Sequence, residues 1–412
     1  MIGPGHRHGR QPTEDDVTDL VRARPDGDDS AALIKFHAPE IVFGDGALAE
    51  IGFAARRLGA RRPLIVTDRG IVEAGWVTIA QRHLSDVGLH SIIFDEITPN
   101  PREHEVESAR ELYEAEGCDV VIGIGGGSAM DAAKGVAILA GQTGSILDYR
   151  GVDHVRHQIP PLLMVPTTSG TGADVSQFCI VTDTTRHVKV TIMGRALVPE
   201  ISITDPRLLV TMPEWLNAAT GLDALTHGIE AFVSRAHNPL ADVHALHAVG
   251  LVDQHLLRTM TAPTDSTARS GMAQASLNAG LAFTNAILGA THAMSHQVGG
   301  LLDAPHGVIN GVLLPHVIRY NAESAPERFI DIARHLGIGE VGAPGEEVAE
   351  ALVERIRMLA DEVGVPRTLR ELGLDESHIE ALSRNSLDDA CLTTNPRSSD
   401  AADIERIFRA AL

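Results

Sequence analysis

The sequence has few aromatic residues, few cysteines and no long hydrophobic run, and each shortage excludes a class of protein. Aromatic residues make up 3% of the 412-residue chain, which leaves few platforms on which nucleic-acid bases could stack. The three cysteines, Cys118, Cys179 and Cys391, are widely separated, so we expect neither a disulfide framework nor a cysteine zinc site. Because the chain lacks a run of ~18 apolar residues and a signal peptide, we expect a cytoplasmic protein that binds no membrane.

Basic residues are also scarce relative to acidic ones. The chain carries 34 Lys and Arg against 55 Asp and Glu, a net charge of -21. This balance opposes binding to a phosphate backbone, so we expect no nucleic-acid partner. What the chain does contain is 44% hydrophobic residues and 20 histidines. The hydrophobic content is typical of a globular protein, and the length suits two or three domains of roughly 150 residues.

The pattern of apolar runs predicts two different halves. Residues 1–30 are polar and lack apolar periodicity, so we expect a disordered tail. Residues 31–208 alternate apolar runs with amphipathic stretches, which predicts an α/β domain with a parallel sheet covered by helices on both faces. The expected strands are Glu40–Phe43, Pro63–Thr67, Ser91–Asp95, Asp119–Gly123, Leu162–Pro166 and Ile201–Thr204, with an extra hairpin at Phe178–Thr182 and Val188–Ile192.

Strand signals stop after about residue 208. Residues 209–412 consist of long Ala-, Leu- and Gly-rich stretches, which predict an all-helical domain. One of these stretches covers residues 266–299. We therefore expect an α/β half followed by an α half.

Two loops of the α/β half have the composition of a nucleotide site. Gly125-Gly126-Gly127-Ser128 lies between an expected strand and an expected helix, where glycines let backbone N–H groups approach a phosphate. The dinucleotide pattern G-x-G-x-x-G fails, because Ser128 occupies its last position. Pro166–Gly172 follows another strand and supplies the hydroxyls of Thr167, Thr168, Ser169 and Thr171. In a parallel sheet both loops meet at the edge where ligands bind.

Asp68 follows a third strand of the same sheet. A carboxylate at this position can accept hydrogen bonds from an adenosine ribose and repel a 2′-phosphate. Asp68 could therefore select NAD over NADP, although a lone Asp at a strand end is more often a helix cap.

Five residues on apolar helical segments form a candidate metal site. Asp223 and His227 are four residues apart, as are His292 and His296, so each pair projects from one helix face. His306 opens another helical stretch ten residues later. Because burying isolated imidazoles and carboxylates is costly, a shared divalent cation is the natural explanation, and the ligand types suit Fe²⁺ or Zn²⁺. Spacing alone does not say which of the five is not a ligand.

Together these motifs resemble the iron-containing (group III) alcohol dehydrogenase family. The resemblance covers roughly residues 34–410 and also includes Pro99-Asn100-Pro101 and Thr394-Asn395-Pro396-Arg397. It implies a dehydroquinate synthase-like architecture, with a dinucleotide domain followed by a helical metal domain. It assigns the metal to Asp223, His227, His292 and His306, and makes His296 a second-shell histidine and possible proton relay. It implies that the cofactor contacts Asp68, Asn100, Gly125, Gly126, Gly127, Ser128, Asp131, Thr167, Thr168 and Thr171.

The resemblance implies that the chain interconverts a primary alcohol and its aldehyde by transferring hydride to and from NAD(H). A bound cation would lower the pKa of the alcohol, and the expected metal is Fe²⁺, with Zn²⁺ as an alternative. Family members form homodimers or larger homo-oligomers, which we also expect here. Two departures from the family pattern, Ser169 and Gly172-Ala173-Asp174, affect the expected nucleotide contacts. The following segment, Val175–Phe178, is most similar to a branch acting on short primary alcohols.

Other functions remain open. Within the family, the main rival is a hydroxyacid–oxoacid transhydrogenase with tightly bound NAD. A maleylacetate reductase lacks the complete metal set, and a cyclase resembling dehydroquinate synthase fits the Asp-plus-three-His pattern less well. From another class, a metallohydrolase could use the same cation to activate water, but it would not need the two nucleotide loops.

Overall fold

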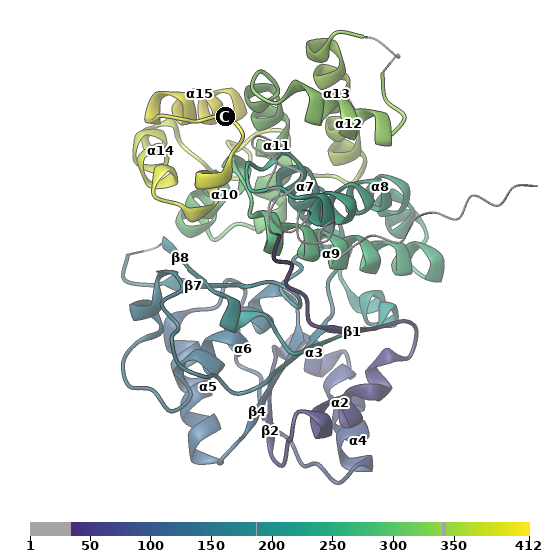
Figure 1. The fold of residues 1–412 in the computed structure, drawn as a ribbon, viewed down its shortest axis with the longest axis vertical. Coiled ribbons are helices and arrows are strands. Elements are labelled where there is room, and N and C mark those ends of the chain that lie inside the picture. Colours follow the sequence, from purple (N-terminus) through teal and green to yellow (C-terminus); the bar gives the residue numbers. More distant parts are fainter. Residues whose placement is uncertain (1–33, 187, 340–342) are drawn as a thin grey trace, which may run out of the picture. The chain divides into compact units, whose positions relative to one another are not determined.

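The computed structural model describes residues 34–186, 188–339 and 343–412. The expected tail, residues 1–30, lies outside these residues. Phe36–Leu412 form one compact unit (Figure 1), whose α/β elements precede its helical elements along the chain. The fold class expected from the sequence is therefore confirmed.

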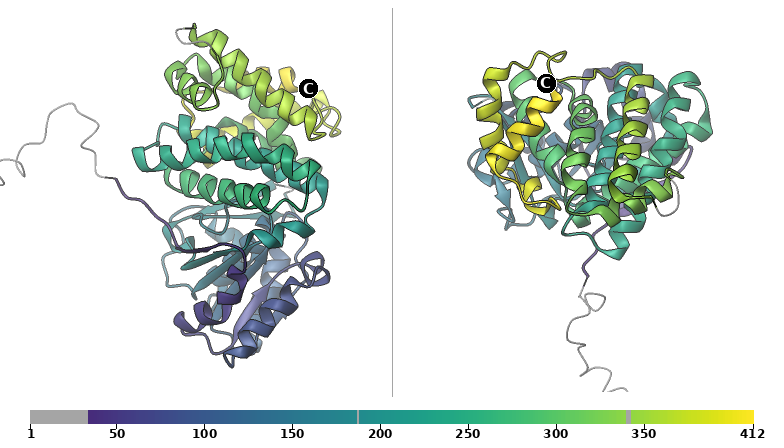
Figure 2. Two further views of the ribbon diagram at one scale, coloured as in Figure 1. Left: turned by 90° about the vertical axis from the view of Figure 1, so that its right-hand side faces the viewer. Right: turned by 90° about the horizontal axis from the view of Figure 1, so that it is seen from above.

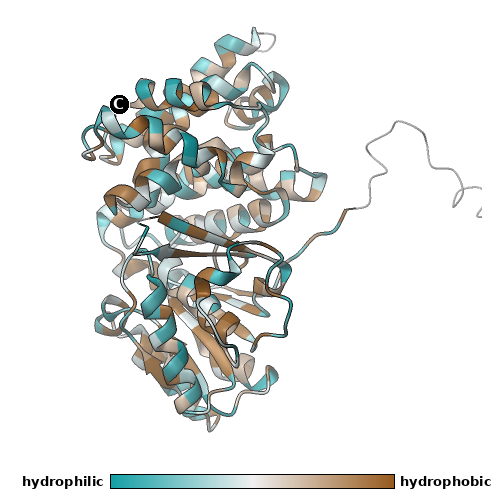
Figure 3. Cartoon of the chain, turned by 90° about the vertical axis from the view of Figure 1, so that its left-hand side faces the viewer, coloured by the Kyte–Doolittle hydropathy of each residue, from teal (hydrophilic) through white to brown (hydrophobic). Residues whose placement is uncertain are grey.

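A six-stranded sheet forms the centre of the α/β half. All of its strand pairs are parallel, and the strand order is β1-β9-β6-β4-β2-β3. Its central strands are fully buried and coloured as hydrophobic in Figure 3. The strands are β1 (Glu40–Phe43), β2 (Pro63–Val66), β3 (Ile92–Phe94), β4 (Val120–Gly125), β6 (Leu162–Pro166) and β9 (Ile201–Thr204).

Helices cover both faces of this sheet, as Figure 1 shows. Successive side chains of a strand point to opposite faces, so Leu64 and Val66 pack with one layer of helices and Ile65 with the other. The first layer contains α5 (Glu103–Ala115) and α6 (Gly127–Leu139), and the second contains α2 (Ile51–Arg57) and α4 (Trp76–Asp86). The short helix α3 (Arg69–Glu73) follows β2.

The expected hairpin belongs to a second, three-stranded sheet. Strands β7 (Phe178–Asp183) and β8 (Val188–Met193) pair antiparallel, and β5 (Gly151–Val152) pairs with β8 in parallel. The sequence analysis missed β5, because two residues carry no periodicity.

The second half is helical, and Figure 2 shows its helices stacked against one side of the α/β half. The helices are α7 (Glu214–Val233), α8 (Pro239–Thr261), α9 (Ser266–Ala286), α10 (Ala290–Leu302), α11 (His306–Ala322), α12 (Pro326–His335), α13 (Gly345–Glu362), α14 (Ile379–Leu387) and α15 (Ala401–Ala411). Short 3-10 helices are η2 (Ala47–Glu50), η3 (Ile146–Tyr149), η4 (Arg195–Leu197), η5 (Pro206–Thr211), η6 (Glu376–His378) and η7 (Ala390–Thr394). No helix of the described residues combines the length and apolarity needed to cross a membrane.

The expectation of one unbroken helical stretch over residues 266–299 is wrong. The chain breaks between α9 and α10, where Ile287 adopts a left-handed backbone with φ of 61°. Tertiary contacts stabilise the new helix start: Glu230 accepts a hydrogen bond from the backbone N–H of Thr291 at 2.6 Å, and Asn395 accepts one from that of Ala290 at 3.1 Å. These partners come from α7 and the end of η7, so the local sequence does not reveal the break.

Candidate active site

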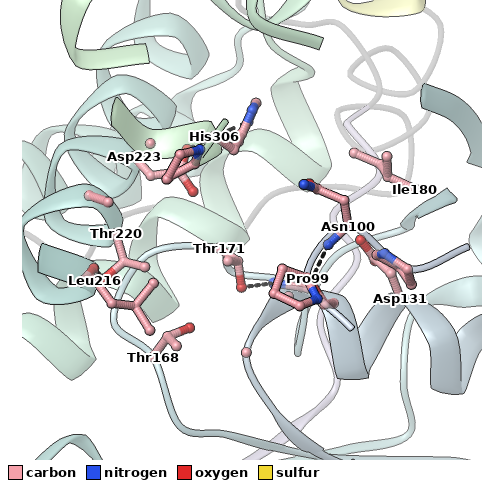
Figure 4. A pocket seen from close by; sticks show the side chains of 18 of the residues that line it. Pro99, Asn100, Asp131, Thr168, Thr171, Ile180, Leu216, Thr220, Asp223 and His306 are labelled. Carbon is pink, nitrogen blue, oxygen red and sulfur yellow. Dashed lines mark hydrogen bonds and ion pairs between the residues drawn. The ribbon is translucent and has the colours of Figure 1, made fainter. Parts of the chain in front are cut away.

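A cavity of about 1110 Å³ lies between the carboxyl ends of the sheet strands and the helices of the second half. Figure 4 shows Asn100 and Asp131 on one side of this cavity and Asp223 and His306 on the other. All of the predicted site residues line it except Gly125, which lies just behind the lining at the end of β4. The structure therefore brings together the two groups of residues that the sequence placed far apart.

The first glycine loop lies at the start of α6. Gly126 is the N-cap of this helix and Gly127 is its first residue, so the helix N-terminus faces the cavity. A Cβ atom on Gly126 would lie 3.1 Å from Thr168 Cγ2, and one on Gly127 would lie 2.9 Å from Thr171 Cγ2. Glycine therefore lets the two loops pack together while the backbone N–H groups stay accessible to an anion.

The second loop lies directly beside the first because β4 and β6 are neighbours. Gly125 and Pro166 are paired across these strands, and the N–H of Thr167 donates to the carbonyl of Gly125 at 2.9 Å. The buried hydroxyls of Thr167, Thr168 and Ser169 have no hydrogen-bond partner among the described residues. Buried hydroxyls normally have partners, so this loop fits a polar ligand such as the ribose and phosphate groups of a dinucleotide.

Asp68 caps a helix and also lines the cavity. Its carboxylate caps α3 by accepting a hydrogen bond from the N–H of Ile71 at 3.1 Å, and the residue also lines the cavity. Burial raises the pKa of Asp68, although hydrogen bonds from the backbone of Ile71 and Gly70 oppose this effect. The helix-cap interpretation is thus confirmed, and it leaves room for a ligand contact as well.

Asn100 links the nucleotide loop to the helical half. Its backbone N–H donates to Ser128 Oγ at 3.1 Å, and its side-chain amide donates to Asp303 Oδ1 at 2.6 Å. Asn100 and Asp303 both have left-handed backbones, with φ of 57° and 51°. A strained backbone held by tertiary contacts is common at functional sites. Asp303 lies three residues before His306 in the sequence.

The metal candidates converge on the carboxylate of Asp223. Asp223 Oδ1 lies 3.8 Å from Nε2 of His227, 3.6 Å from Nε2 of His292 and 3.8 Å from Nε2 of His306. Asp223 and His227 project from α7, His292 from α10, and His306 is the first residue of α11. The geometry thus groups Asp223 with these three histidines, in the combination that the family resemblance implies.

Hydrogen bonds orient the imidazole rings so that each Nε2 faces this centre. His292 Nδ1 donates to Glu230 Oε2 at 2.6 Å, and His227 Nδ1 donates to the carbonyl of Gly170 at 3.2 Å. With a cation bound, these bonds would keep the proton on Nδ1 and leave Nε2 to face the cation, as in metal-binding histidines. Glu230 thus holds the ring of His292 in place.

Two glycines permit the close approach of the elements that carry these residues. A Cβ atom on Gly307 would lie 1.9 Å from the carbonyl oxygen of Ala219 in α7, and one on Gly170 would lie 2.3 Å from that of Thr220. Any larger residue at Gly307 would push His306 away from Asp223, and any larger residue at Gly170 would separate the nucleotide loop from α7.

The pKa values of this group describe its charges in the absence of a cation. Burial lowers the pKa of His227 to about 4 and holds that of His306 well below its usual value, so both rings are neutral near pH 7. Burial opposes ionisation of Asp223 too, but the facing histidines lower its pKa. Burial also opposes protonation of His292, yet hydrogen bonds to Asp223 and Glu230 raise its pKa to about 9. A buried carboxylate with three imidazole nitrogens is a suitable ligand set for Fe²⁺ or Zn²⁺.

His296 lies beside this group and has a different partner. Its Nδ1 lies 2.9 Å from Asp389 Oδ2, and its ring stacks on that of His306 at a centroid distance of 5.3 Å. It lines the cavity, as a residue facing the substrate would. His296 is therefore the one of the five candidates that lies outside the cluster around Asp223.

The sequence analysis missed several polar residues around the cavity, among them Lys189, Asn310 and Asp389. Lys189 lies on β8 and lines the cavity, and burial lowers its pKa to about 8 although the carboxylates of Asp131, Asp223 and Asp303 oppose this shift. Asn310 follows His306 by one helical turn. The spacing of four from His306 was a usable signal for Asn310. Lys189 and Asp389 carried none, because only the tertiary fold brings them to the site.

Asp174, one of the two departures from the family pattern, does not line the main cavity. It is buried and accepts a hydrogen bond from Ser202 Oγ at 2.7 Å. Its neighbour Ala173 does line the cavity. The Asp174 departure therefore changes the packing behind the loop.

Comparisons with known proteins agree with this geometry. The sequence profile described as "Iron-containing alcohol dehydrogenase" matches residues 38–206, and that described as "Fe-containing alcohol dehydrogenase family, C-terminal" matches residues 217–412. The 1,3-propanediol dehydrogenase of Citrobacter freundii is 39% identical over 385 residues, which is 93% of this chain and 100% of that protein. Alcohol dehydrogenase 4 of Schizosaccharomyces pombe is 40% identical over 380 residues, which is 92% of this chain and 89% of that protein.

A solved structure of similar fold leads to the same family. The crystal structure of a 1,3-propanediol oxidoreductase superimposes with a TM-score of 0.89 at 38% identity, covering 92% of this chain and 100% of the other. Both halves of the chain are thus matched by profile, sequence and structure. The chain belongs to the iron-containing alcohol dehydrogenase family.

Proposed function

We propose that this protein interconverts a short primary alcohol and its aldehyde with NAD(H), using the cavity between its two halves. Family membership establishes an alcohol–aldehyde oxidoreductase that uses NAD and a metal. The observation that carries the residue assignment is the convergence of three Nε2 atoms within 3.8 Å of Asp223 Oδ1, in the wall of a cavity that also contains the nucleotide loops. The metal ligands proposed are Asp223, His227, His292 and His306, with Fe²⁺ as the metal and Zn²⁺ as the alternative.

The cofactors, when bound, supply a Lewis acid for the substrate oxygen and a nicotinamide for hydride transfer. The protein contributes position and exclusion of water. Glu230 and the carbonyl of Gly170 hold two imidazoles with their Nε2 atoms inward. Asp389 holds the Nδ1 proton of His296, which leaves the Nε2 atom of His296 to accept or return the hydroxyl proton.

The nucleotide residues proposed from the sequence have complementary positions. Gly125, Gly126, Gly127 and Ser128 surround the N-terminus of α6, where a pyrophosphate is favoured. The orphan hydroxyls of Thr167 and Thr168, together with Thr171 and Asp68, suit the ribose and adenine side. Asn100 and Asp131 line the same side of the cavity as this helix N-terminus, across from Asp223 and His306.

We also propose the remaining features expected from the sequence. The domain boundary near residues 208 and 209 is supported by the end of β9 at Thr204 and the start of α7 at Glu214. A reducing, cytoplasmic location is supported by Cys118, Cys179 and Cys391, which are all free and buried. A homo-oligomer is supported by the family resemblance. A substrate of the 1,3-propanediol type is supported by the relatives with that name.

The test is an anaerobic assay of the metal-stripped protein that follows the absorbance of reduced nicotinamide. Ethanol, propanol, 1,3-propanediol, lactaldehyde and 4-hydroxybutyrate are each offered with NAD⁺ or NADP⁺, before and after addition of Fe²⁺ or Zn²⁺. We expect metal-restored reduction of NAD⁺ by a simple alcohol. Consumption of a hydroxyacid only with an added oxoacid, without net nicotinamide change, would instead identify a transhydrogenase. No redox turnover with any substrate would overturn the proposal.

A further inference from the structure

The side chain of Asn310 lies at the centre of the proposed metal ligands. Asn310 is fully buried on α11. Its Nδ2 atom lies 2.8 Å from Asp223 Oδ1, 3.3 Å from His292 Nε2 and 3.2 Å from His306 Nε2. A single amide nitrogen thus contacts three of the four proposed ligand atoms.

The other end of the same amide is unusual. Asn310 Oδ1 is buried and has no hydrogen-bond partner among the described residues. Leaving a buried acceptor unpaired is unfavourable, so the contacts of Nδ2 must outweigh this loss. Rotating the amide would not help, because Oδ1 would then face the carboxylate oxygen of Asp223 and the lone pair of His306 Nε2. The surroundings of Asn310 therefore select a donor that points at the ligand set.

An amide group has two N–H hydrogens, and the acceptors that face them before a cation binds are Asp223 Oδ1 and His306 Nε2. The contact with Asp223 is the shortest, and it is also shorter than the 3.6 to 3.8 Å between Asp223 Oδ1 and the three histidines. Because hydrogen bonds to an ionised acceptor are the stronger ones, one N–H is committed to Asp223. The other N–H faces His306 Nε2 at a longer distance of 3.2 Å, so this lone pair is held less firmly.

We propose that Asn310 is a positioning residue that holds Asp223 Oδ1 toward the three histidines and so preorganises the site for a divalent cation. The amide keeps the buried carboxylate paired, and its weaker contact with His306 Nε2 would leave that nitrogen available to a cation. This inference rests on the metal-binding part of the proposed function. It predicts that the donor on residue 310 affects cation affinity without affecting NAD.

The test measures cation and cofactor affinity separately in Asn310→Leu and Asn310→Ala. Leucine has a similar volume but no donor, and alanine removes the donor without overfilling the site. The matched control is Asn217→Leu, since Asn217 is also buried and its amide donates to Thr259 Oγ1 at 2.9 Å, away from the ligand set. Zn²⁺ dissociation constants are measured by competition with a chromophoric chelator, and NAD⁺ binding by calorimetry.

We expect the Zn²⁺ dissociation constant to rise about 10- to 100-fold in both Asn310 variants, as for other residues that orient metal ligands. The control should keep the affinity of the original protein, and NAD⁺ binding should be unchanged in all three. Unchanged Zn²⁺ affinity in a folded Asn310 variant would overturn the inference, as would an equal loss in Asn217→Leu, which would indicate general destabilisation. If the original protein bound NAD⁺ but no Zn²⁺, the proposed metal site itself would be wrong.

Discussion

His296 Nδ1 lies 2.9 Å from Asp389 Oδ2, although 93 residues separate them in the sequence. Burial would raise the pKa of Asp389, but the charge and hydrogen bond of His296, with a backbone hydrogen bond from Cys391, lower it. An ionised Asp389 accepts the Nδ1 proton and fixes the tautomer of His296. His296 is therefore prepared to act through Nε2 on the cavity side.

Replacing Asp389 with Asn should impair this arrangement and leave the metal in place. An amide is uncharged and no longer fixes the proton on Nδ1, so we expect kcat/KM to fall roughly 10- to 100-fold, part of the contribution typical of acid–base groups. The measurement is alcohol oxidation with NAD⁺ across a pH series, with metal content determined in parallel. Asp388→Asn is the control, because Asp388 is the exposed neighbour. If Asp389→Asn and Asp388→Asn oxidised the alcohol at equal rates, His296 would not take part in proton transfer.

Glu230→Gln should weaken metal binding. Glu230 Oε2 accepts the Nδ1 proton of His292 at 2.6 Å, and Oε1 accepts the N–H of Thr291 at 2.6 Å. An amide presents only one acceptor oxygen, so one of these donors loses its partner. We expect a 10- to 100-fold rise in the dissociation constant for Zn²⁺ or Fe²⁺, measured by chelator competition. Glu105→Gln, a buried carboxylate that bonds Thr98 and Arg102, should leave this constant unchanged; a similar rise there would contradict the explanation.

Gly127→Ala should weaken NAD⁺ binding and leave metal binding intact. The added Cβ would lie 2.9 Å from Thr171 Cγ2, so the two loops must separate at the point where backbone N–H groups face the cavity. We expect the dissociation constant for NAD⁺ to rise about tenfold, equivalent to about 1.4 kcal/mol. Calorimetry measures this constant. Gly345→Ala, at the first position of α13, serves as the control, and an unchanged constant in Gly127→Ala would place the pyrophosphate elsewhere.

The parts of the site that the sequence predicted are those encoded locally. Asp223 and His227 share one helix face because they are four residues apart, and Gly126 lies at a strand-to-helix junction because the apolar run ends there. Local patterns of this kind predict the structure well, because the backbone geometry fixes the periodicity of helices and strands. They predicted both loops and the group of candidate ligands.

What the sequence could not predict depends on contacts between distant segments. The break after α9 follows from Glu230 and Asn395, which hold the N-terminus of α10. The separation of His296 from the cluster around Asp223 depends on Asp389, and the donor at the centre of that cluster is Asn310. Glu230, Asn395 and Asp389 read locally as ordinary helix or loop residues, because their partners in these contacts lie at least 61 residues away in the sequence. Asn310 is the exception, since it follows His306 by four residues.

Asp131 should make the stability of the protein depend on pH. It lies on the cavity wall near Lys134 of α6 and Lys189 of β8, and burial raises its pKa to about 7 although both lysines oppose this effect. Between pH 3.8, the ordinary pKa of an Asp side chain, and pH 7, the folded state holds a proton that the unfolded state has lost. The contribution of Asp131 to stability is therefore fully present below pH 3.8 and is lost as the pH rises through 7.

Asp131→Asn removes this titration, so the variant should gain stability relative to the original protein as the pH rises. The difference in free energy of unfolding should grow by up to about 1.4 kcal/mol per pH unit between pH 5 and 7 and level off above that range. Urea unfolding of the metal- and NAD-free proteins at pH 5, 6, 7 and 8 measures it, and the other titrating groups cancel in the comparison. A difference that stays constant over this range would show that Asp131 is already ionised in the folded protein at pH 5, and that Lys134 and Lys189 outweigh its burial.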